Sequence, residues 1–189
     1  MKKWLLLLVA LVMSVSCACA ESATVTVHDF GDFTMELPAD IPVQYDLPEK
    51  ADTEVWFTIY PGAPAGDTAT NFNCLWVSDV MDLSAVSNSE VQAFAAGYQS
   101  QIVPGFEASG MKVTRFEMLD YGKMEIGGKP AIFFSISMTV NYGQMDLTMV
   151  MTQWMVSCDG GTYTFTGTAI SRNDMDSLVT PLLDLISWK

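Results

Sequence analysis

The chain has 189 residues with 9 basic and 22 acidic side chains, so its net charge is −13 at neutral pH. This length suits one domain with a sizeable core. The acidic balance argues against nucleic acid and anionic lipid surfaces as partners, because both would be repelled.

The first twenty residues have the pattern of a secretory signal peptide. Two lysines precede ten almost wholly apolar residues (4–13), and the A-C-A sequence at 18–20 matches a small-residue cleavage site. The apolar stretch is shorter than the roughly 20 residues that span a bilayer. We therefore predict export and cleavage after Ala20, which gives a secreted or extracytoplasmic protein. A lipid anchor on Cys17 or Cys19 is the alternative.

Cleavage would leave residues 21–189 as a single domain. Seven basic and 22 acidic residues would remain, so the net charge would become −15. We expect this charge to keep the exported protein soluble, with no membrane insertion after cleavage. The partner would be a protein or a small ligand, and not nucleic acid.

The first half of this domain predicts short strands between loops rich in proline and glycine. Alternating and β-branched residues predict strands at 24–27, 33–37, 54–60 and 73–78. Pro38 and Pro42 begin an irregular crossing, and the PGAPAG sequence at 61–66 marks a loop.

One helix has a clear start signal at Ser87. Glu90 three residues later completes a capping box, in which each residue satisfies a backbone N–H of the other. Apolar residues then recur at helical spacing and predict one buried face, at Val91, Phe94, Ala95, Tyr98 and Ile102. The Pro104-Gly105 pair predicts the end of this helix.

The second half predicts an antiparallel meander. After strands at 112–119 and 121–126, three apolar runs at 131–140, 145–156 and 162–170 are separated by turns that contain glycine. The middle run is apolar on both faces, so we expect it to be central and covered on both sides.

A second helical period follows the meander, after Asn173 and Asp174 as a candidate cap. Its apolar positions are Met175, Leu178, Val179, Leu182 and Ile186. Pro181 lies inside this pattern and predicts either a kink or a new start capped by Thr180.

These elements predict an α+β fold, a mostly antiparallel sheet with helices packed on its faces. Their order resembles the PsbP-like α/β/α sandwich, also seen in DcrB-type bacterial envelope lipoproteins. The resemblance rests on an F-T-M-E-L-P entry strand at 33–38, a G-G-K-P-A turn at 127–131 and a last helix ending in 186–189. It implies a single PsbP-like domain at 21–189 with a non-catalytic accessory or binding role. It supplies no functional residues that can be transferred to this chain.

No catalytic, cofactor-binding or metal site is predicted. His28 is the single histidine; a catalytic triad built on it would need a distant nucleophile, and no G-x-S-x-G sequence is present. One histidine and two mature cysteines are too few for an ordinary zinc site. Residues 173–176 imitate the opening of a calcium loop but lack its glycine and final glutamate. A methionine row could bind Cu(I), although flexible core packing is the simpler reading, at Met145, Met149, Met151 and Met155.

Cys74 and Cys158 are the two cysteines that remain after cleavage. An exported chain meets oxidising conditions, and both residues lie at predicted strand ends, so we predict a disulfide between them. It would close a loop of about 84 residues, worth roughly 4–5 kcal/mol in the chain-entropy model. Two separate buried thiols are the alternative.

The leading functional hypothesis is an exported, non-catalytic binding or accessory module of the cell envelope or exterior. The alternative is an extracytoplasmic hydrolase that uses paired carboxylates. A deep pocket with convergent polar groups would favour the enzyme, whereas a shallow cleft or an exposed aromatic patch would favour binding.

Overall fold

The fold was determined as a computed structural model that describes residues 24–45 and 55–189. The predicted signal peptide, with Cys17 and Cys19, lies outside the described residues. The described part forms a seven-stranded antiparallel sheet in the order β3-β4-β5-β9-β8-β7-β6. Its strands are β3 (Val43–Tyr45), β4 (Val55–Ile59), β5 (Asn71–Val77), β6 (Lys112–Ile126), β7 (Lys129–Tyr142), β8 (Met145–Cys158) and β9 (Gly161–Ala169).

The predicted meander is confirmed as the core of this sheet. β6, β7, β8 and β9 follow one another in sequence and in space, joined by tight turns. The two strands predicted at 112–126 are one strand, β6, with bulges at Val113/Arg115 and Met118/Asp120. Each bulge adds a residue that interrupts the alternation, and this is why the sequence suggested a break. The short strand β3 was missed, because three residues after Pro42 give no readable alternation.

A smaller sheet of three strands closes one end of the molecule. β1 (Val25–Asp29) and β10 (Ile186–Trp188) pair antiparallel with β2 (Phe33–Pro38) on either side. The prediction that the last helix ends in residues 186–189 is therefore wrong. Ile186 and Trp188 instead pair with β2, and the indole Nε1 of Trp188 donates to the carbonyl of Ile126 at the end of β6 over 2.9 Å. Such a pairing between the two chain ends cannot be read from a local pattern.

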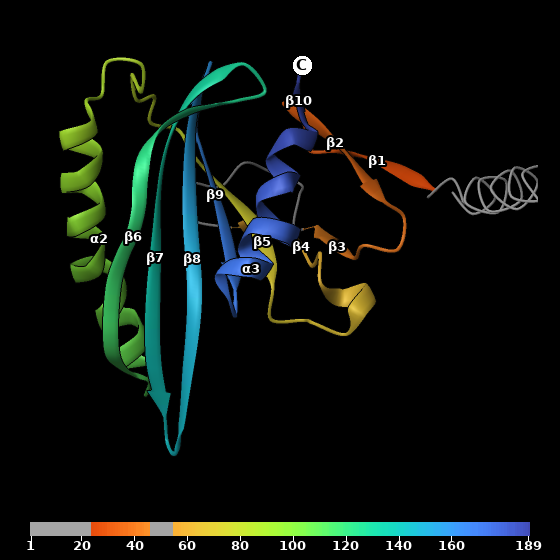
Figure 1. Cartoon of the computed structure of the whole chain (residues 1–189). Coiled ribbons are helices and arrows are strands. Elements are labelled where there is room, and N and C mark those ends of the chain that lie inside the picture. The colour runs from red at the N-terminus through yellow and green to blue at the C-terminus, as the bar shows by residue number, and fades with distance from the viewer. Residues whose placement is uncertain (1–23, 46–54) are drawn as a thin grey trace, which may run out of the picture.

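Helix α2 (Asn88–Ala108) lies along β6 and β7 on one face of the sheet (Figure 1). Its capping box is confirmed: Ser87 Oγ accepts from the Glu90 N–H over 3.3 Å, and Glu90 accepts from the Ser87 N–H over 2.8 Å. Val91 and Ala95 are buried against the sheet as predicted, whereas Phe94, predicted on the same buried face, is 36% exposed. The predicted end at Pro104 is wrong, because the helix continues through the proline to Ala108. Pro104 therefore lies inside the helix, where it removes one backbone hydrogen bond without ending it.

The C-terminal helical segment crosses the opposite face of the sheet (Figure 1). It consists of a short α-helical turn, α3 (Arg172–Asp174), followed by a π-helical stretch, η2 (Met175–Val179), and a 3-10 stretch, η3 (Thr180–Leu185). Its N-cap is Ser171 and not the predicted Asn173-Asp174, since Ser171 Oγ accepts from the Asp174 N–H over 3.1 Å. Thr180 does not cap a new helix either, because Val179 occupies that position and Pro181 lies in the first turn of η3.

The main core lies between the sheet and this C-terminal segment, closed at one end by the small sheet. It is strongly aromatic, with Phe33, Phe72, Tyr163 and Phe165 each fully buried. Trp154 on β8 faces this core and Met155 faces α2, so the prediction of a central strand covered on both sides is confirmed for that half of β8. Within residues 24–45 and 55–189, no helix is long and apolar enough to cross a bilayer.

Candidate functional site

The sheet face under the C-terminal segment changes from apolar to polar along β7. Because antiparallel partners share a face, each cross-strand pair of β7 and β8 can be read as one row. Phe133 pairs with Trp154, the next row is Ser135 with Thr152, and two rows further on Thr139 pairs with Thr148. The C-terminal segment covers the apolar rows and begins at this boundary.

A pocket of about 300 Å³ lies at the boundary, between the sheet and the start of the C-terminal segment. This volume is at the lower end of the range for small-molecule sites, roughly 300–1,000 Å³. Its apolar wall consists of Met124, Phe133, Val150, Trp154 and Met175. Its polar wall consists of Asp120, Ser135, Thr152, Arg172, Asp176 and Thr180. We refer to it as the helix–sheet pocket.

Two hydroxyl groups define the floor of the helix–sheet pocket. Thr152 is only 5% exposed, and its Oγ1 donates to Ser135 Oγ over 2.9 Å. Because Ser135 Oγ accepts this bond, its own hydroxyl hydrogen can still be donated, and the side chain is exposed enough to donate it to a bound molecule. Thr152 is the buried member of this pair, and its hydrogen bond to Ser135 offsets the cost of burying its hydroxyl.

Charged groups form the rim of the pocket. Asp120, Arg172 and Asp176 are all exposed, and Arg172 Nε lies 3.8 Å from Asp176 Oδ2 one helical turn along. An exposed pair at this distance contributes little to stability. With two carboxylates and one guanidinium, the rim has a slight excess of negative charge, so a neutral or positively charged group would be accepted most readily.

Local backbone features place these side chains. The bulge at Met118/Asp120 shifts β6 by one residue, which turns Asp120 onto the same face as Ser135. Gly167 on β9 lets η2 approach the sheet closely: a Cβ atom there would lie 2.5 Å from Val179 Cγ1. The Ser171 cap then starts the helical segment so that Arg172 and Asp176 fall on the pocket side.

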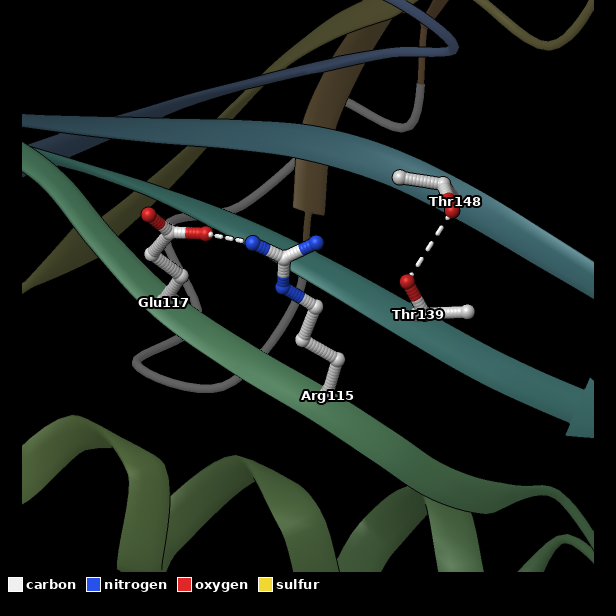
Figure 2. A network of polar contacts seen from close by, with 4 residues as sticks. All are labelled: Arg115, Glu117, Thr139 and Thr148. Atoms are coloured by element: carbon white, nitrogen blue, oxygen red, sulfur yellow. Dashed lines mark hydrogen bonds and ion pairs between the residues drawn. The ribbon is translucent and has the colours of Figure 1, made fainter.

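Beyond the pocket, the same face of β6–β8 is an open polar surface (Figure 2). Arg115 Nη2 donates to Glu117 Oε2 over 2.6 Å, and the hydroxyls of Thr139 and Thr148 lie 2.9 Å apart. Arg115 and Glu117 keep 69% and 48% of their side-chain surface exposed, so this ion pair is solvated. These four residues lie outside the pocket and provide natural controls for it.

The carboxylates of the pocket lie at its exposed rim, whereas the less exposed polar groups are hydroxyls. Asp120 and Asp176 line one pocket, which is the arrangement that the hydrolase alternative requires. Both carboxylates are nevertheless solvent-exposed, whereas a general acid of this kind is normally held in a dehydrated, apolar setting. The buried polar groups of the pocket are neutral hydroxyls, which orient a ligand but do not activate water without a partner base.

The two cysteines of the predicted disulfide point into the same core but are not bonded in the structure. Cys74 is fully buried on β5, and its Sγ lies 3.7 Å from the Leu75 carbonyl oxygen. Burial raises the pKa of the Cys74 thiol, and the nearby Cys158 raises it further. Cys158 is half-buried at the end of β8, beside hollows lined by Lys129 and Asp159. The disulfide remains a prediction.

The other residues considered from sequence lie apart from the pocket. The His28 ring stacks near Phe30 and Tyr45, and its Nδ1 contacts the Tyr45 hydroxyl. In the methionine row, Met155 is 8% exposed and belongs to the core, whereas Met145 is 70% exposed. Core packing therefore explains Met155 but not Met145. Among the described residues, no group of three or more His, Cys, Asp or Glu side chains is arranged to hold a metal ion.

Sequence reasoning missed the pocket residues altogether. One signal was present: on this face Ser135 follows Phe133 and Thr152 precedes Trp154, which marks the change from apolar to polar residues. The sequence analysis used these runs only to predict strands, and it did not consider the polar residues within them as candidate site residues. Asp120, Arg172 and Asp176 carry no such signal, because only the β6 bulge and the return of the C-terminal segment bring them to this boundary.

Comparison with known proteins identifies the fold. No protein-family model matches the sequence, and a search of curated proteins finds no match. The solved structure of cyanobacterial PsbP (CyanoP) from Synechocystis is similar over 92% of this chain and 97% of its own, with 12% identity and a TM-score of 0.53. LpqN of Mycobacterium tuberculosis, described as involved in cell envelope biogenesis, matches 87% of this chain and 91% of its own, with 15% identity and a TM-score of 0.43. On the likeness to CyanoP, the chain has a PsbP-like α+β fold, as the sequence predicted.

Proposed function

We propose that the protein is an exported, non-catalytic binding module that holds a small molecule in the helix–sheet pocket. The observation that carries this proposal is the hydroxyl pair of Ser135 and Thr152, which lies beside the apolar wall at the floor of a pocket with a charged rim. A few convergent polar groups in a mostly apolar concave site are typical of small-ligand binding. The signal-peptide pattern and the PsbP-like fold support export and an accessory role.

The walls restrict the chemistry of the ligand. Phe133, Trp154 and Met175 offer apolar surface to one side of the ligand, and Ser135 offers a hydroxyl to the other. The rim favours a neutral or cationic group, because Asp120 and Asp176 outnumber Arg172. The ligand is therefore a small molecule with an apolar body and one uncharged or positively charged polar group.

Native mass spectrometry of the protein from its own host would test the proposal. We expect a non-covalent adduct on the wild type and its loss in Ser135→Leu, which fills the pocket and removes the hydroxyl. Thr139→Leu is the matched control, because Thr139 lies on the same strand and face but outside the pocket. A wild type without an adduct, or an adduct that survives Ser135→Leu, would contradict the proposal.

The same preparation separates binding from the hydrolase alternative. A binding module releases the molecule that it bound, whereas a hydrolase would release a cleaved product. If released material differs from the bound material, and if Asp120→Asn or Asp176→Asn prevents the change, the carboxylates act catalytically and the binding proposal is wrong.

A further inference from the structure

The opposite sheet face, on the side of α2, has an uncharged region that the proposed pocket does not use. No charged residue occurs in β3, β4, β5 or β9, although the whole chain has 31 charged side chains of four types, 22 of them acidic. One row of paired residues crosses this region from β3 to β9 through Gln44, Thr58, Asn73 and Thr166, and continues to Gln153 on β8. We call this row, with the adjacent Asn71, the neutral platform.

The neutral platform is accessible. α2 covers β6 and β7 on this face, and the segment after β5 covers one end, where the Thr162 hydroxyl donates to the Asp79 carbonyl over 2.7 Å. Between these two covers, Thr58, Asn73 and Thr166 are each partly exposed, and Gln44 is exposed at the β3 edge. Four strand spacings separate β3 from β8, so the row is on the order of 19 Å long.

Hydrogen bonds orient side chains at both ends of the platform. Gln153 Nε2 donates to Tyr98 OH over 2.9 Å and to Thr166 Oγ1 over 3.3 Å. At the other end, Tyr60 OH donates to Gln44 Oε1 over 3.4 Å. Amide and hydroxyl groups that are already oriented lose less conformational freedom when they bind a partner.

We propose that the neutral platform binds an uncharged polysaccharide chain. Amides and hydroxyls both donate and accept hydrogen bonds, which matches a ligand made of hydroxyl groups. An ionic ligand would find no counter-charge on β3, β4, β5 or β9, and the acidic chain as a whole repels polyanions. A protein partner is a poorer match, because the cores of protein interfaces are apolar and aromatic. A row about 19 Å long suits an extended chain better than a single small molecule.

Retention of the purified protein on cellulose, chitin and cross-linked dextran tests this proposal. We expect the wild type to be retained on at least one of the three. Asn73→Ala with Thr166→Ala should weaken retention about tenfold or more, because two ligand hydrogen bonds are lost. The control is Thr139→Ala with Thr148→Ala, a hydrogen-bonded pair on the opposite face (Figure 2), which should bind as the wild type does.

Gln44→Ala provides a second variant, because this exposed edge residue can be changed without disturbing the core; it should also weaken retention. Circular dichroism would establish that each variant is folded. Absence of wild-type retention on all three polymers would overturn the proposal. Retention unchanged by both platform variants would overturn it as well, and so would an equal loss in the control pair. If the platform variants instead dissociate a dimer in sedimentation experiments, the face is a contact between copies of the chain and the proposal is wrong.

Discussion

Replacing Gly167 by alanine should push the C-terminal segment away from the sheet. The added Cβ would lie 2.5 Å from Val179 Cγ1 and 3.1 Å from both the Met175 sulfur and the Trp154 ring. Val179 is fully buried, so it cannot rotate into open space. Overpacking of this kind costs about 1–3 kcal/mol. For a domain of this size, that cost lowers the melting temperature by about 2–12 °C.

Urea unfolding followed by tryptophan fluorescence would measure the change in the free energy of unfolding. Gly97→Ala on α2 is the matched control, because a Cβ there meets no atom within 4 Å. Alanine is the better helix former, so this control should stabilise the protein by about 0.5–1 kcal/mol. If Gly167→Ala proves as stable as the wild type, the C-terminal segment does not pack on the sheet as described. The helix–sheet pocket, which this segment covers, would then be wrong as well.

Three further predictions concern the cysteines, the helix cap and export. Titration of the denatured, unreduced mature protein should find no thiol if Cys74 and Cys158 are bonded, and two thiols would rule the disulfide out. Hydrogen bonds from Ser87 lower the pKa of Glu90 below its ordinary value of 4.5, so its stabilisation is present above about pH 4.5 and is lost as the pH falls through the lowered pKa; acid urea titrations should show a smaller loss for Glu90→Gln than for the wild type. Intact mass from the native host should place the N-terminus at Glu21, and a diacylglyceryl increment would show a lipid anchor instead.

The parts of the fold that follow from local chemistry were predictable. The capping box at Ser87 was read correctly because both of its hydrogen bonds join residues three apart. The meander from β7 to β9 was read correctly because tight turns place consecutive strands side by side. In each case the residues that interact are also close in sequence, so the pattern contains the necessary information.

The errors arose where distant contacts override a local signal. Proline usually ends a helix, yet α2 continues through Pro104 to Ala108. Ile186 continues a helical period, yet its pairing with Met35 on β2 makes it part of a strand. The pocket could not be predicted for the same reason. Asp120 and Arg172 line one pocket only after the C-terminal segment has folded back over the sheet.

The most direct test of the central claim is a crystal structure of the protein purified, without denaturation, from its native host. We predict density for a small molecule in the helix–sheet pocket, with a polar atom within hydrogen-bond distance of Ser135 Oγ and an apolar part against Trp154. A pocket that holds only water in the native preparation would contradict the account.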